Sequence, residues 1–239
     1  MAKKDSIVDL NKALVFQVGH LGEAYDKWVH QPIITKEGPR FFDNDVLELL
    51  TKTVWWAVPL IWVPVAFWFI SKSVSFGVAY SNIAALVVCG IAAATLTEYI
   101  MHRFLFHIKT TSYWGNTTHY LLHGYHHKHP MDALRLVLPP AVTLIMIIPL
   151  WILLKLLTPE TVTPAVFAGL LLGYVKYDCT HYFLHHSKPG KLGLQSELKT
   201  YHMNHHFRIQ DMGFGVTSSF WDKVFGTYPP SYDQKKKKT

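Results

Sequence analysis

Long stretches without a charged side chain constrain the fold of this chain more than any other feature. Four stretches are free of Asp, Glu, Lys and Arg: residues 54–70, 74–97, 136–154 and 161–175. A helix needs ~20 apolar residues to cross the hydrocarbon core of a bilayer. The sequence therefore predicts an all-α integral membrane protein with four transmembrane helices. The predicted spans are residues 54–70, 74–100, 136–154 and 161–180, and the last is long enough only if it continues to residue 180.

The links between these spans predict how they are arranged. Very short links, at residues 71–73 and 155–160, join the first span to the second and the third to the fourth, so the spans form two hairpins. Each link contains one lysine, Lys72 or Lys155, and the other side holds the remaining Lys and Arg, 23 − 2 = 21. Because Lys and Arg accumulate on the cytosolic side of membrane proteins, both termini are expected in the cytosol.

The chain divides into two predicted regions. Residues 1–53 are expected to form cytosolic helices, an amphipathic one over residues 5–30 and a short interfacial one over residues 41–53. Residues 54–239 are expected to contain the spans and a helical cap, made by the segments after the second and fourth spans. This cap is the expected position of the histidine-rich motifs.

Composition favours a membrane as the main partner. Charged residues are only 16% of the chain and hydrophobic residues are 50%, with eight Trp and twelve Tyr, which collect at bilayer interfaces. The formal net charge of +7 is spread among apolar segments, except for the run Lys235 to Lys238. An anionic membrane surface accounts for this charge better than nucleic acid does, so no nucleic-acid partner is expected.

Ten of the fifteen histidines fall into four closely spaced groups. The spacings are H-x4-H, H-x2-H-H, H-x3-H and H-x2-H-H, in that order. Their members are His102 and His107; His123, His126 and His127; His181 and His185; and His202, His205 and His206. Positions three and four apart share a helix face, so each of the last three groups can direct at least two imidazoles to one point. His102 and His107 require a bend or a helix end, because they lie about 140° apart on a regular helix.

This pattern indicates metal binding. Ten neutral imidazoles at one membrane face are difficult to bury together unless metal ions hold them. Ten ligands exceed what one ion accepts, so a dinuclear site is predicted, and no Asp or Glu lies in the groups to bridge the ions. The ions are therefore expected farther apart than the ~3.5–4 Å of bridged sites. Imidazole suits iron, zinc, copper and nickel, and the spacing leaves the metal open.

The histidine pattern over four apolar spans resembles the fatty acid hydroxylase superfamily of membrane di-iron enzymes. The segments E-Y-I-M-H-R-F-L-F-H, H-G-Y-H-H-K-H-P-M-D, Y-H-M-N-H-H-F and F-G-V-T-S-S-F-W-D-K-V-F-G-T are similar to fatty acid 2-hydroxylases in particular. The similarity extends over roughly residues 15–230. Many fungal and animal members carry an N-terminal cytochrome b5 domain with a His-Pro-Gly-Gly motif. This sequence has no such motif, and in this it resembles the plant members.

The resemblance implies a reaction and its cofactors. The expected activity is O2-dependent 2-hydroxylation of long and very long fatty acyl groups, those of sphingolipids and ceramides above all, at two iron ions, which zinc can replace in purified protein. The (2R)-hydroxy product is implied by the resemblance alone. NADH-derived electrons would arrive through a reductase and a separate cytochrome b5. Sterol or sphingoid-base oxidation by the same superfamily is an alternative. A zinc transporter is a further alternative. A transporter needs polar or ionisable residues at the bilayer midplane on several helices, and these spans lack them.

Two further residues and the C-terminus carry functional hypotheses. Asp178 lies one helical turn before His181 and is a candidate to orient an imidazole or a metal-bound water; pairing with a lysine at a helix end is the alternative. His30 is a candidate to fold over the metal site; the alternative is a histidine in an exposed loop. The final K-K-K-K-T resembles a dilysine retrieval signal, so the endoplasmic reticulum membrane is the expected location, although a polybasic tail on anionic lipid has the same composition.

Overall fold

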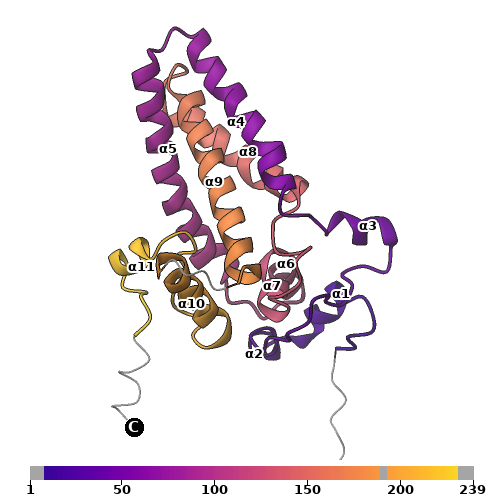
Figure 1. Ribbon diagram of the computed structural model, residues 1–239. Helices are drawn as coiled ribbons and strands as arrows, with labels where there is room; N and C mark the ends of the chain where they lie inside the picture. Colours follow the sequence, from indigo (N-terminus) through magenta and orange to yellow (C-terminus); the bar gives the residue numbers. More distant parts are fainter. Residues whose placement is uncertain (1–7, 189–192, 231–239) are drawn as a thin grey trace, which may run out of the picture.

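The long helices form one bundle, and the shorter helices form a cap at one of its ends (Figure 1). The computed structural model describes residues 8–188 and 193–230, and all regular structure in these ranges is helical. The bundle consists of α4 (Ala57–Ser75), α5 (Tyr80–Ile100), α8 (Pro140–Leu157) and α9 (Thr163–His186). The cap contains α6 (Tyr113–His119), α7 (Tyr125–Lys128), α10 (Gly193–Phe207) and α11 (Phe220–Val224).

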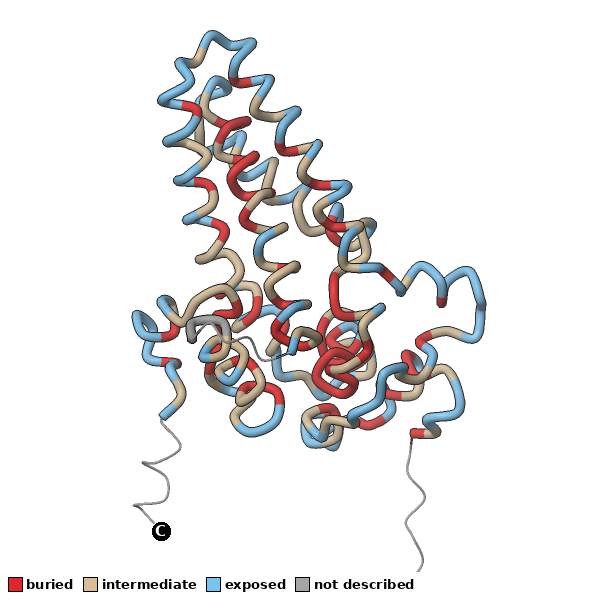
Figure 2. Tube along the Cα trace, viewed as in Figure 1, coloured by how far each residue is buried: buried red, intermediate tan, exposed pale blue. Residues whose placement is uncertain are grey.

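Three of the four predicted spans are long and apolar enough to cross a membrane. They are α4, the continuous helix from Tyr80 to Phe106 that includes α5, and α8. The fourth, α9, has 24 residues, but its carboxyl half carries Lys176, Asp178 and histidines. Most of its amino-terminal half is buried against the neighbouring helices, and it occupies the middle of the bundle (Figure 2). A central helix needs less apolar surface than a helix that faces lipid.

The hairpin turns lie later in the chain than the sequence predicts. Residues 71–73 belong to the last turns of α4, and the chain reverses at Gly77, which has a φ of 75° that favours glycine. Lys155 likewise lies in the last turn of α8, and α9 begins at Thr163 with Pro164 in its first turn. Both lysines remain at the end of the bundle opposite the cap, as predicted (Figure 1).

Two glycines let α5 and α9 approach each other closely. A Cβ atom on Gly169 would lie 2.2 Å from the carbonyl oxygen of Val87, and one on Gly90 would lie 2.2 Å from that of Val166. Small residues allow such backbone contact between membrane helices, where packing replaces the hydrophobic effect as the driving force. The contact fixes the position of α9, and with it the histidines at the carboxyl end of this helix.

In contrast, α8 packs loosely against the bundle. Only one of its residues, Thr143, is buried, whereas side chains such as Leu153 and Leu156 are exposed. Exposed apolar side chains of this kind are expected to face lipid. The loose packing leaves a cavity between α8 and the α5–α9 pair.

The N-terminal segment packs on the cap and not as one amphipathic helix. The predicted helix over residues 5–30, whose first residues lie outside the described ranges, is instead divided into α1 (Val15–Val18), a 3-10 turn (Gly19–Leu21) and α2 (Ala24–Val29). Gly22, with a φ of 53°, breaks the helix. Apolar side chains of these turns form a buried cluster with Tyr120 and Tyr125 of the cap.

A buried arginine holds the predicted interfacial helix, α3 (Asp45–Leu50), against the cap. Arg135 forms ion pairs with Glu48 of α3 and with Asp132, the latter at 2.9 Å. It also donates hydrogen bonds to Thr51 and to the Tyr125 hydroxyl. A buried ion pair of this kind is strongly destabilising to break, because one charge would remain without its partner.

Candidate dinuclear metal centre

A π-helical segment, Met101–Phe106, continues α5 and brings the first pair of histidines together. The turn of this segment is wider than that of an α-helix, because the His107 N–H donates to the His102 carbonyl five residues earlier, at 3.1 Å. On a regular helix these two side chains point in different directions, whereas the wider turn places their rings 4.9 Å apart between centroids. The bend that the sequence requires is therefore a π-helical turn, a feature that is frequent at functional sites.

The ten predicted histidines meet in two groups of five, each able to hold one ion. The first group consists of His102, His107, His123, His127 and His205. The second consists of His126, His181, His185, His202 and His206. Within each group the candidate ligand atoms lie within 4.8 Å of one another, and neither group contains a carboxylate among the described residues.

The distances between ligand nitrogens in the first group fit a single ion. The Nε2 of His127 lies 3.0 Å from that of His123 and 3.1 Å from that of His107. The His107–His205 and His102–His123 distances are 3.0 and 3.1 Å. Nitrogens bound at ~2.1 Å and at right angles lie ~3.0 Å apart, whereas a tetrahedral angle would separate them by ~3.4 Å. The group therefore matches an ion with five or six ligands.

The second group has the same character. The His202 Nε2 lies 2.9 Å from that of His185 and 3.1 Å from that of His206. The Nε2 atoms of His126 and His181 are buried and have no hydrogen-bond partner. Buried polar atoms are rarely left unpaired, because this costs the full desolvation penalty. A metal ion would satisfy all five nitrogens, so the donor set fits a metal in both groups.

Burial keeps these imidazoles in the form that binds metal. It lowers the pKa of His123, His127 and His206 far below the usual value for histidine, and neighbouring histidines lower it further. These side chains are therefore neutral at physiological pH and present a free lone pair to an ion.

The loop after α10 orients two ligands of the first group. The His102 Nδ1 donates to the carbonyl of Phe214 at 2.5 Å, and the His205 Nδ1 donates to the carbonyl of Met212 at 2.8 Å. Each bond fixes the ring and directs Nε2 toward the other histidines of the group, as outer partners of metal-binding histidines commonly do.

Two carboxylates hold this loop, the buried Asp222 and the partly buried Glu98. Asp222 accepts hydrogen bonds from the N–H groups of Phe214 and Gly215, at 2.9 and 2.8 Å, and from the Thr227 hydroxyl. Glu98 of α5 accepts bonds from the N–H groups of Val216 and Thr217 and from the Thr217 hydroxyl. For Asp222 the sequence offered one signal, the position of this carboxylate within the motif F-W-D-K-V-F-G. It did not reveal the hydrogen-bond partners of Asp222.

His30 lies at the edge of the first group. Its ring is stacked on His107 at 6.0 Å and meets His127 edge-on at 5.2 Å, while its Nδ1 donates to the Asp26 carbonyl. The Nε2 of His30 is buried without a hydrogen-bond partner. Lys128 holds the surrounding turn by donating to the carbonyls of Trp28 and Gln31. The structure thus places His30 over the site and not in an exposed loop.

Asp178 is buried near the second group but is bound to other partners. It accepts hydrogen bonds from the Tyr174 hydroxyl at 2.9 Å and from the Leu138 N–H at 3.4 Å. No hydrogen bond joins Asp178 to a histidine or a lysine within the described ranges. It lines a cavity of about 600 Å³ whose wall also includes His123, His126 and His181, so the carboxylate faces the same space as three ligands.

Comparisons with known proteins show which family this chain is similar to. The family model for fatty acid hydroxylase matches residues 87–227. The chain is 61% identical to the dihydroceramide fatty acyl 2-hydroxylase FAH1 of Arabidopsis thaliana, over 96% of each protein. It is 42% identical to the fatty acid 2-hydroxylase of Homo sapiens, over 94% of this chain and 65% of that protein. The solved structure titled "Full length scs7p (only hydroxylase domain visible)" superposes with a TM-score of 0.86 at 40% identity, covering 93% of this chain and 86% of that one. The family match includes all ten clustered histidines, and the chain belongs to the fatty acid hydroxylase family.

Proposed function

We propose that this protein catalyses the O2-dependent 2-hydroxylation of long and very long fatty acyl groups, those of ceramides above all. The observation that carries the proposal is the pair of complete five-histidine groups. The names of the relatives support the reaction and the substrate class, since the Arabidopsis thaliana proteins are called dihydroceramide fatty acyl 2-hydroxylases. These similarities favour this activity over sterol or sphingoid-base oxidation and over zinc transport.

Two iron ions are the proposed cofactors, one held by each histidine group. When bound, they would activate O2 for insertion into a C–H bond. Five imidazoles exceed the four ligands of a structural zinc site, although zinc can replace iron in purified protein because it binds such ligands more tightly than Fe(II). Without a bridging carboxylate, the separation between the ions should exceed ~3.5–4 Å.

The protein's own residues would position the substrate and exclude water. The wall with His123, His126 and His181 faces the cavity of about 600 Å³, and His30 stacks on His107 of the first group. Asp178, at the same wall, would orient an imidazole or a metal-bound water at the second site. His30 would do the same at the first site. The acyl carboxyl end would be held at the cap, so that C2 lies beside the ions; positioning errors of about an ångström are costly. The (2R) configuration is proposed from the family resemblance.

The source of electrons can be tested together with the reaction. We expect a ceramide-producing host that lacks its own 2-hydroxylase to accumulate 2-hydroxyacyl ceramides when it expresses the chain, as measured by lipid mass spectrometry. The proposed electron donor is a separate cytochrome b5, so deletion of the host cytochrome b5 should remove most of the product. Full product formation without cytochrome b5 would contradict the proposed donor, and oxidised sterols or sphingoid bases in place of 2-hydroxyacyl groups would contradict the reaction.

The proposed topology places the cap and both termini in the cytosol of the endoplasmic reticulum membrane. All four bundle helices, α9 included, would then span the bilayer. Lys72 and Lys155 lie at the far end, while α1 and α11 both lie at the cap end (Figure 1); the lysine run at residues 235–238 lies outside the described residues. A glycosylation acceptor fused to the C-terminus should stay unmodified in microsomes, and its modification would reverse the topology.

A further inference from the structure

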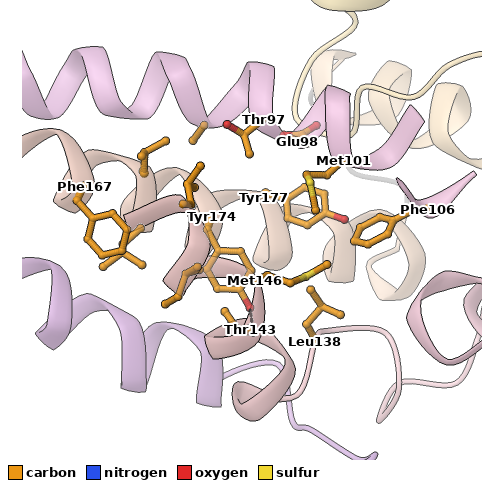
Figure 3. Close-up of a pocket in the computed structure, with 15 residues that line it drawn as sticks. Thr97, Glu98, Met101, Phe106, Leu138, Thr143, Met146, Phe167, Tyr174 and Tyr177 are labelled. Atoms are coloured by element: carbon orange, nitrogen blue, oxygen red, sulfur yellow. Dashed lines mark hydrogen bonds between the residues drawn. The ribbon is translucent and has the colours of Figure 1, made fainter. Parts of the chain in front are cut away.

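A second cavity lies inside the membrane bundle and extends into it from the cap end. It has a volume of about 150 Å³ and lies between α5, α8 and α9 (Figure 3). Ala94 of α5, Ile147 and Leu150 of α8, and Phe167 and Leu170 of α9 contribute to its lining. The cavity exists because α8 stands away from the α5–α9 pair, as its single buried residue shows. We call this space the bundle chamber.

The bundle chamber adjoins the cavity that reaches the histidine groups. Four residues line both spaces: Phe106, Leu138, Met146 and Tyr177. These residues gather at one end of the chamber (Figure 3). The larger cavity contains His123, His126 and His181 in its wall. A ligand whose polar end lies beside the ions can therefore extend its apolar end into the bundle.

Aromatic side chains gather at the other end of the bundle chamber. Phe167 is buried, and its ring meets that of Phe69 edge-on and that of Trp151 at a tilt, each at 4.8 Å between ring centroids. Tyr177, at the shared end, lies ten residues farther along α9, which corresponds to ~15 Å. This distance corresponds to on the order of ten carbons of extended hydrocarbon, at ~1.5 Å or less per carbon. An apolar cavity of about 150 Å³ takes a ligand about the size of benzene, so the chamber holds roughly six carbons of a tail.

We propose that the bundle chamber holds the tail of the substrate acyl chain, with Phe167 as its floor, and that it sets the preference for chain length. This inference rests on the proposed 2-hydroxylation. The reacting carbon is held from the polar end, so the hydroxyl stays at C2 whatever the tail occupies. Each buried methylene of the tail contributes to affinity, and the depth of the chamber limits how many methylenes are buried.

The test compares two leucines on the same helix. Leu150→Trp fills the chamber, whereas Leu153→Trp makes the same change on the exposed face of α8. Cells that express the wild-type chain or one of the variants are supplied with ceramides of different acyl lengths. The 2-hydroxy products are then quantified for each length. Leu150→Trp should lower the product ratio of the longest to the shortest chains about tenfold, the effect of displacing two buried methylenes. Leu153→Trp should leave the ratio unchanged.

Phe167→Ala removes the floor and so enlarges the chamber. It should raise the product ratio of the longest to the shortest chains. The proposal is overturned if Leu150→Trp and Leu153→Trp give the same distribution, or if Leu150→Trp lowers all chain lengths equally. A hydroxyl that moves away from C2 in either chamber variant would also overturn it. Absence of any 2-hydroxy product from the wild type is a different result, because it contradicts the proposed function itself. Metal content of the purified variants confirms that the cap has folded.

Discussion

Replacing His205 by alanine should lower the yield of 2-hydroxyacyl lipid at least about 100-fold and remove metal from the first histidine group. His205 is almost fully buried, its Nε2 lies 3.0 Å from that of His107, and its Nδ1 is held by the Met212 carbonyl. Loss of an outer partner alone commonly costs 10–100-fold in metal affinity or activity, so loss of a ligand should cost at least the upper end of that range. Lipid mass spectrometry and metal analysis of the purified protein measure the two effects.

The matched control for this change is His20→Ala. His20 is exposed, packs against Tyr113, and belongs to neither five-histidine group. It should keep both metals and full product yield. Retention of two metals and wild-type yield in His205→Ala would show that this residue is not a ligand, and the proposed first group would be wrong.

Asp222→Asn should weaken the first metal site while leaving the second intact. The carboxylate accepts hydrogen bonds at both oxygens from the Phe214 and Gly215 N–H groups, and an amide can accept only one of them. The Phe214 carbonyl, which orients His102, would then shift. We expect metal affinity at the first site to fall 10–100-fold. A chelator titration should release one ion readily and the other at the wild-type concentration of chelator.

Asp211→Asn provides the control on the same loop. It makes the same chemical change at a residue that is exposed. The retained ion at the second site shows that Asp222→Asn has folded, so loss of both ions together would indicate general unfolding and contradict a local positioning role. Simultaneous release of both ions at the wild-type chelator concentration would show that Asp222 does not act through His102.

The sequence by itself determined the chemistry of this protein. The four histidine groups and the uncharged stretches depend on side-chain type and short spacing, which are local properties. The requirement for a bend between His102 and His107 also followed from helix geometry, and it is confirmed as a π-helical segment. By contrast, the prediction of a single amphipathic helix over residues 5–30 was wrong. Gly22 has a positive φ that breaks the helix, and the spacing of apolar residues does not reveal it.

Only the tertiary structure decided how the ten histidines divide between the two groups of five. In each H-x2-H-H motif the first and last histidines join one group and the middle one joins the other: His123 and His127 separate from His126. Successive residues point ~100° apart around a helix, so neighbouring histidines face different sides, but which side meets which partner depends on helices far apart in the chain. The same holds for Glu98, whose partners Val216 and Thr217 lie about 120 residues later. Such contacts leave no periodic pattern, because they depend on the close packing of α5 and α9 and on the path of the final loop.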